Sequence, residues 1–173
     1  MSKSAWKRYA KGGSPLYSIE RLGFKYNMMD IQAAMGIHQL KKLPAFNEAR
    51  TRLAALYDKA FSNFSEIRVQ KSAPYDHVHS HHLYPIILES KKLKINRDDF
   101  VAKMGEMNVG TGIHFTAVHH HPYYKDIFKN DLSNLPVASD VSENILSLPL
   151  YPGLSENDVQ DVIDATKKLV SAS

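Results

Sequence analysis

Apolar side chains recur at helical spacing in the first third of the chain. Their intervals of three and four residues predict a helix over residues 28–40. Pro44 marks the next boundary, because proline suits the first turn of a helix, and a second apolar pattern continues from there to about Phe61. The sequence therefore predicts two consecutive helices that meet near Leu43.

Short apolar runs in the middle of the chain predict strands. Two of them are "IRVQ" at residues 67–70 and "HHLYPIIL" at residues 81–88. The second run is almost continuously apolar, which is typical of a strand in a sheet that is covered on both faces. A further short strand is expected at "TGIHF", residues 111–115.

Helices are expected between and after these strands. Asn96 can cap one that ends near Asn108, because asparagine tolerates the left-handed backbone of a helix end. Residues 137–145 have a helical pattern, and Ser155 with Asp158 gives a start like a capping box to the last helix. The order of elements predicts an α+β domain.

The composition is that of an ordinary globular chain and narrows the function mainly by exclusion. The 173 residues carry a net charge of +4 with dispersed basic side chains, so we expect no nucleic-acid surface. The absence of cysteine excludes disulfides, thiolate nucleophiles and cysteine-based zinc sites. No apolar run approaches the roughly 20 residues of a membrane span. With no apolar segment near the start, a cytoplasmic location is expected.

Nine histidines raise the question of a metal site. His77 and His79 would share one face of a strand, but apart from Asp76 no further ligand is evident nearby. The three histidines at 119–121 are consecutive, so regular structure cannot point all of them at one centre. We therefore expect no metal site and a solvated polar loop around His77, His79 and His81.

Other chemical patterns are incomplete. The chain has no GxSxG turn and no evident pair of catalytic carboxylates. The glycines of "VGTG" at 109–112 follow an expected helix, whereas a dinucleotide-binding turn follows a strand and opens a helix. The helices that meet near Pro44 resemble a helix-turn-helix, but the second is too long and apolar for a recognition helix. Residue types and spacing alone give no reaction.

Residues 23–43, "GFKYNMMDIQAAMGIHQLKKL", resemble the "YNxxDIQAAxGxxQLxKL" signature of the DegT/DnrJ/EryC1/StrS family. These PLP-dependent aminotransferases aminate keto groups of nucleotide-linked sugars. Three more segments follow in the family's order, namely "HLYPIIL" at 82–88, "VGTGIHFTAVHHHPYY" at 109–124 and "LSLPLYPGLSENDVQDVI" at 146–163. The "GTGxHF" pattern is most similar to the UDP-4-amino-4-deoxy-arabinose aminotransferase branch, in which glutamate donates the amino group.

The resemblance implies an α+β fold, the C-terminal small domain of a fold-type I aminotransferase, with a small antiparallel sheet and flanking helices. Residues 1–43 would be the end of the large domain with a connecting helix, and residues 44–173 the small domain. In the family, the lysine that forms the Schiff base with PLP lies upstream of the first matching segment. Lys7, Lys11 and Lys25 are therefore not candidates for that role.

A transaminase needs this lysine and also a carboxylate partner for the cofactor's pyridinium nitrogen. Both belong to the part of the family's pattern that has no counterpart here. The resemblance therefore implies no catalytic residue in this chain, no PLP bound by the chain alone and no activity by itself.

The matching motifs supply candidate cofactor contacts near the start of the first helix. Asn27 matches the asparagine that reaches across a dimer interface to the partner subunit's PLP phosphate, and its amide can donate the required hydrogen bond. The alternative is that Asn27 caps a helix that begins at Met28. Tyr26 beside it is a weaker candidate for a substrate contact, with a core position as the alternative.

The histidine-containing motif supplies candidate substrate contacts. The family places this loop beside the sugar-nucleotide pocket, so His114 is the first candidate, with Phe115 and Tyr123 as wall residues. The alternative for His114 is a strand histidine whose hydrogen bonds are satisfied internally. His119 matches a histidine of many relatives, whereas His82, which opens the strand at 82–88, is expected to be structural.

Two functions of different classes follow. The first is the C-terminal part of a homodimeric PLP-dependent aminotransferase that uses a nucleotide-linked keto sugar and an amino donor in cell-surface polysaccharide synthesis. The second is a non-catalytic dimerisation or regulatory module derived from that family. The apolar helix before Leu43 would pack on a large domain in the complete enzyme, so the chain alone is expected to self-associate.

Overall fold

The computed structural model describes residues 10–13, 22–128 and 135–172, and Lys7 lies outside them. The chain divides into two compact units, Met1–Lys41 and Lys42–Ser173. Within the described residues, no helix is both long and apolar enough to cross a membrane.

Helix α1 (Asp30–Phe61) is continuous and contains Pro44 in its interior. The predicted boundary near Leu43 is therefore wrong. An interior proline removes one backbone hydrogen bond and crowds the carbonyl four residues earlier, here that of Leu40. Leu40 is 68% exposed, so this turn of the helix is not packed in a core, and the helix continues through the proline.

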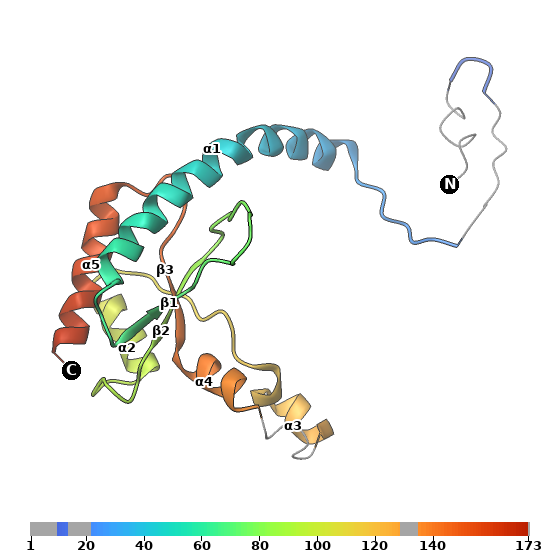
Figure 1. Ribbon diagram of the computed structural model, residues 1–173. Helices are drawn as coiled ribbons and strands as arrows, with labels where there is room; N and C mark the ends of the chain where they lie inside the picture. The colour runs from blue at the N-terminus through green and yellow to red at the C-terminus, as the bar shows by residue number, and fades with distance from the viewer. Residues whose placement is uncertain (1–9, 14–21, 129–134, 173) are drawn as a thin grey trace. The chain divides into compact units, whose positions relative to one another are not determined.

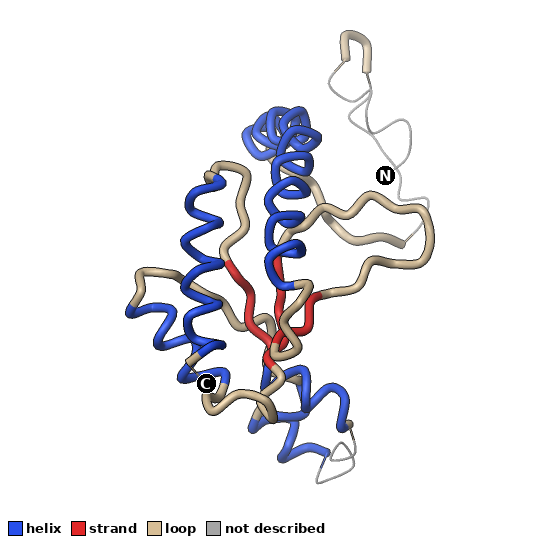
Figure 2. The backbone as a smooth tube through the Cα atoms, turned by 60° about the vertical axis from the view of Figure 1, so that its left-hand side comes forward, coloured by secondary structure: helices blue, strands red, loops and turns tan. Residues whose placement is uncertain are grey.

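The second unit is built on a three-stranded antiparallel sheet in the order β1-β2-β3 (Figure 2). The strands are β1 (Ile67–Val69), β2 (Tyr84–Leu88) and β3 (Ile145–Leu148). Along β2, buried residues alternate with half-buried ones. The sheet thus has one face in the core and a second face that is only partly covered, whereas the continuous apolar run predicted two covered faces.

The other helices lie between and after the strands, and some of them cover the buried face of the sheet. They are α2 (Arg97–Glu106), the 3₁₀ turn η2 (Val118–His120), α3 (Pro122–Phe128), α4 (Pro136–Asn144) and α5 (Glu156–Ser171). One core joins the second half of α1 with the sheet, α2 and α5 (Figure 1). Its fully buried side chains include Leu53, Tyr57, Phe61, Ile86, Phe100, Met104, Leu146 and Val159. The predicted α+β class and small antiparallel sheet with flanking helices are confirmed.

The predicted helix ends of α2 and α5 are also confirmed. The Asn96 side chain accepts from the Asp99 N–H at 2.9 Å and caps α2. Asn108 adopts a left-handed φ of 60° after that helix. At the start of α5, Ser155 and Asp158 form a reciprocal capping box. These signals are local in sequence, which is why they could be read without the tertiary fold.

The strand expected at residues 111–115 is not formed. Only Gly112 pairs with β3, through a single bridge to Ser147 whose two backbone hydrogen bonds measure 3.1 and 2.7 Å. Beyond the bridge the chain leaves the sheet, and Phe115 is 74% exposed. The segment is therefore a loop that is attached to the sheet at one point.

Candidate functional site

The loop that contains His114 is held against β3 by backbone and side-chain hydrogen bonds. Beside the bridge between Gly112 and Ser147, the His114 imidazole Nδ1 lies 3.0 Å from Ser147 Oγ. Ser147 is buried and His114 is half-buried. His114 therefore has an internal hydrogen-bond partner, as its structural alternative predicted, while one edge of its ring remains open.

Gly112 makes room for this histidine. A Cβ atom at position 112 would lie only 2.5 Å from His114 Cε1. Real Cβ atoms do not approach a neighbouring atom so closely, so a side chain here would displace the imidazole. The glycine is therefore required by the close approach of the ring to the backbone.

Two serines of α4 hold the next part of the loop. Ser142 Oγ accepts from the Ala117 N–H at 2.7 Å. Ser139 Oγ lies 2.8 Å from His119 Nε2 and 3.2 Å from His120 Nε2. His119 thus anchors the loop to α4. Sequence reasoning missed these serines, although small polar residues within the apolar pattern at 137–148 were a detectable signal.

Of the two predicted wall residues, Phe115 lies beside His114 and Tyr123 does not. The Phe115 ring meets the His114 ring edge to face, with centroids 4.9 Å apart. Tyr123 is exposed on α3 and packs against the ring of Tyr124 at 5.3 Å. No ring contact or hydrogen bond between described residues joins Tyr123 to His114 or Phe115.

In the first unit, residues 22–29, which directly precede α1, are exposed. The N-terminal cap of α1 comes from Gln32, whose Oε1 accepts from the Met29 N–H at 3.1 Å. The alternative that Asn27 caps a helix beginning at Met28 is therefore wrong. Asn27 is exposed and makes no hydrogen bond to a described residue. Tyr26 is 85% exposed and stacks on Phe24 instead of entering a core.

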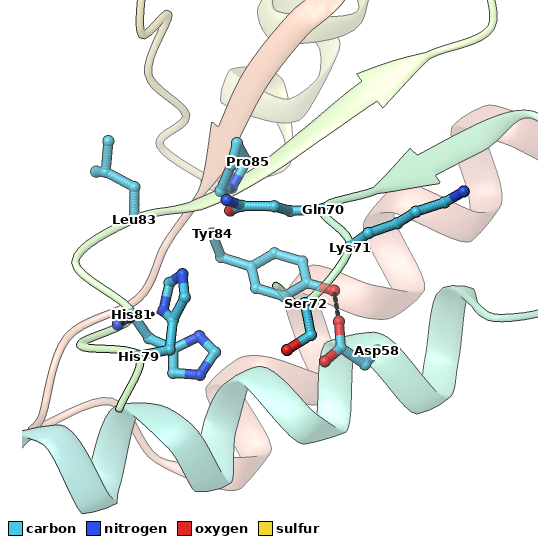
Figure 3. Close-up of a pocket in the computed structure, with 9 residues that line it drawn as sticks. All are labelled: Asp58, Gln70, Lys71, Ser72, His79, His81, Leu83, Tyr84 and Pro85. Carbon is cyan, nitrogen blue, oxygen red and sulfur yellow. Dashed lines mark hydrogen bonds between the residues drawn. The ribbon is translucent and has the colours of Figure 1, made fainter. Parts of the chain in front are cut away.

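A separate polar pocket of about 250 Å³ lies between α1 and the connection from β1 to β2 (Figure 3). At its base the Tyr84 O–H donates to Asp58 Oδ1 at 2.6 Å. The rings of His79 and His81 lie together at one side, with centroids 4.2 Å apart. Figure 3 shows the Lys71 side chain extending away from these groups.

The histidines of this pocket are not simply solvated, which corrects the expectation of a polar loop. The His81 N–H donates to His79 Nδ1 at 2.9 Å, and His81 has a left-handed φ of 44°. Burial lowers the pKa of His81, the neighbouring His79 lowers it further, and Asp58 opposes the shift. His77 remains on the surface, where its Nδ1 lies 2.7 Å from the Tyr75 carbonyl.

Burial also raises the pKa of Tyr84, and its hydrogen bond to Asp58 adds to the increase. The tyrosine therefore keeps its proton and remains a donor to the carboxylate across the neutral range. Among the described residues, no group of three or more histidine, aspartate or glutamate side chains is arranged to hold a metal ion. The described pocket thus offers hydrogen-bonding groups to a ligand.

A sequence model of the DegT/DnrJ/EryC1/StrS aminotransferase family matches residues 1–167. The chain is 41% identical over 171 residues to the uncharacterized protein MJ1066 of Methanocaldococcus jannaschii, covering 99% of this chain and 44% of that protein. It is 39% identical over 174 residues to the spore coat polysaccharide biosynthesis protein SpsC of Bacillus subtilis, with 100% and 44% covered. The chain thus spans less than half the length of these relatives.

Solved structures agree with the sequence comparison. The PLP form of Spr1654 from Streptococcus pneumoniae, designated a sugar aminotransferase, aligns with a TM-score of 0.78 at 26% identity. The alignment covers 92% of this chain and 40% of that chain. The described fold therefore corresponds to a part of a larger enzyme fold.

Proposed function

This chain belongs to the DegT/DnrJ/EryC1/StrS aminotransferase family, and from that membership we propose that it is the C-terminal part of a PLP-dependent sugar aminotransferase. The complete enzyme would transfer an amino group from glutamate to a keto sugar linked to a nucleotide. The observation that carries this proposal is the match to relatives of which the chain spans only 44%.

The residues present indicate which groups of the PLP site this chain would supply. A PLP site needs a lysine, a carboxylate partner for the ring nitrogen and donors to the phosphate. Of these, Asn27 offers an exposed amide without a described partner, which fits a phosphate contact. Lys11 and Lys25 are exposed and make no ion pair with a described carboxylate. The chain alone is proposed to bind no PLP and to be inactive.

When bound in the complete enzyme, PLP would carry the amino group from the donor to the acceptor sugar. The residues of this chain would act around it. We propose that Asn27 binds the phosphate across a homodimer interface. We further propose that residues 1–43 form the end of the large domain with a connecting helix, and that residues 44–173 form the small domain.

His114 is proposed to contact the substrate, with Phe115 as a flat apolar wall beside it. The edge-to-face packing of the two rings holds them together, and the exposed Phe115 can cover a sugar ring. Tyr123 and Tyr26 are proposed as more distant contacts that the rest of the enzyme would bring to the pocket. The SpsC relative supports a role in cell-surface polysaccharide synthesis. The arabinose branch stays a prediction.

A non-catalytic dimerisation or regulatory module is the second candidate. The observation that favours it is a set of exposed apolar side chains in the first unit, namely Leu22, Phe24, Met28, Met29, Ile31, Met35, Ile37 and Leu40. Such a surface needs a partner. The rest of an enzyme and a second copy of the chain would both satisfy that need.

Activity measurements separate the two candidates. The complete enzyme should convert a UDP-linked 4-keto sugar to the amino sugar with glutamate, whereas this chain alone should show neither conversion nor the absorbance of bound PLP. Transamination by the isolated chain would contradict the proposed division of labour. A complete gene product that neither binds PLP nor transaminates would favour the regulatory module.

A further inference from the structure

The hydrogen bond between His114 and Ser147 determines where the imidazole proton lies. Ser147 is 4% exposed, and its Oγ has no hydrogen bond to a described residue other than His114. If Nδ1 carried the proton, the serine hydroxyl hydrogen would be buried without an acceptor, which is unfavourable. All groups are paired when the serine O–H donates to Nδ1, which places the imidazole proton on Nε2.

The opposite side of the ring is open. Nε2 makes no hydrogen bond to a described residue. It is also not one of the side-chain atoms that are both buried and without a hydrogen-bond partner. It is therefore reached by solvent in the described structure. A neutral imidazole with its proton on Nε2 offers one N–H donor there and no acceptor.

We infer that Ser147 and Gly112 are positioning residues that hold His114 with its Nε2–H directed at an oxygen of the substrate. This inference rests on the proposed contact between His114 and the nucleotide sugar. Ser147 selects the tautomer, and Gly112 selects the ring position because any side chain there would collide with His114 Cε1. The pair thus selects for a hydroxyl, carbonyl or phosphate oxygen that accepts a hydrogen bond.

The tautomer can be observed without any activity. In ¹⁵N NMR spectra of the 173-residue chain, an imidazole nitrogen without a proton resonates far downfield of one that carries it. We expect His114 Nδ1 to be the unprotonated nitrogen at neutral pH. Ser147→Ala should give a mixture of tautomers, and Ser147→Thr, which keeps the hydroxyl, should restore the original pattern.

Ser139→Ala is the matched control, because it removes a serine that bonds to His119 and His120 in the same loop and leaves His114 alone. It should not change the His114 signals. A proton on His114 Nδ1 in the unaltered chain, or His114 signals that Ser147→Ala leaves unchanged, would overturn the inference.

Kinetics of the complete enzyme test the consequence. Ser147→Ala should lower kcat/KM about tenfold, the effect of one misplaced hydrogen bond, and Ser147→Thr should recover most of it. Because Ser147 acts through His114, the double variant with His114→Ala should be no worse than His114→Ala alone. Gly112→Ala should reproduce the loss, which protects the test if Ser147→Ala fails to fold.

Activity of the variants distinguishes a wrong substrate contact at His114 from a wrong positioning role for Ser147 and Gly112. If His114→Ala keeps full activity, both the substrate contact and this inference are wrong. If His114→Ala is impaired while Ser147→Ala and Gly112→Ala keep full activity, only the positioning role is wrong and the proposed function stands.

Discussion

The two ends of helix α1 carry similar apolar side chains in opposite surroundings. Ile31 and Leu40 near its start are 74% and 68% exposed, whereas Leu53 and Tyr57 near its end have no exposed surface. The end packs into the core of the second unit, and the start belongs to the other unit. Apolar periodicity therefore tells which side chains need to be covered, but it does not tell what covers them.

The largest expected difference between the two ends is in stability. Leu53→Ala removes a fully buried side chain and should lower the free energy of unfolding by about 2–5 kcal/mol. Leu40→Ala makes the same chemical change on an exposed position of the same helix and should change it by less than about 0.5 kcal/mol. Urea unfolding followed by circular dichroism measures both. Equal losses would mean that the start of α1 is packed as well.

Self-association is expected to depend on the exposed start of α1 and not on its buried end. Replacing Ile31 and Met35 together by serine removes two exposed apolar side chains and should weaken association of the chain at least about tenfold. Sedimentation over a concentration series measures this. Leu53→Ala is not a suitable control, because it destabilises the core. Val137→Ser, at another exposed apolar position, is the better control. A monodisperse monomer for the unaltered chain would refute the expected association.

A smaller effect is expected where α1 meets the polar pocket. Tyr84→Phe removes the hydrogen bond to Asp58 and should cost about 1 kcal/mol at neutral pH. Because the folded state raises the pKa of Tyr84, it holds this proton more tightly than the unfolded chain, whose tyrosines titrate near pH 10. The unaltered chain should therefore lose stability as the pH rises above about 10.

That alkaline loss should be less steep in the Tyr84→Phe variant. Part of it will remain, because burial also raises the pKa of Tyr57. Unfolding at pH 7 and at pH 11 gives the comparison, and an identical alkaline loss in both proteins would show that Tyr84 is not the group responsible.

The smallest expected effect concerns His81. Its pKa is lowered in the folded state, so the unfolded chain binds the proton more readily and stability should fall as the pH drops below about 6.5. His81→Asn removes the titration, and asparagine tolerates the left-handed backbone at this position. Melting temperatures at pH 7.5 and pH 5.5 should then differ less than in the unaltered chain.

His77→Asn is the matched control for this measurement, because His77 lies on the surface of the same connection and contacts only local groups. It should leave the acid loss of stability unchanged. The same reduction in both variants would mean that the loss does not arise at His81.

Sequence signals that act within a few residues predicted the structure well. The caps at Asn96 and Ser155 and the left-handed Asn108 needed only local patterns. Pro44 misled because its effect depends on whether that turn of the helix is packed in a core, which sequence does not tell. The strand expected at 111–115 failed because its pairing depends on a distant partner and only one residue finds it.

The site was predictable only in part for the same reason. Motif resemblance selected His114 and Asn27, but the serine that orients His114 lies 33 residues further along the chain, and only the fold brings them together. The pocket around His79 and His81 likewise depends on Asp58 from α1. No spacing rule connects such residues.

We propose that the exposed start of α1 packs on a further part of a larger enzyme and that this further part carries the catalytic lysine. The most direct test is the intact mass of the native gene product, captured from source cells with an antibody raised against this chain. A species of about twice the chain's 19.6 kDa or more is predicted, because the relatives are covered to only 44%. A native species of 19.6 kDa would contradict the claim and leave a stand-alone module.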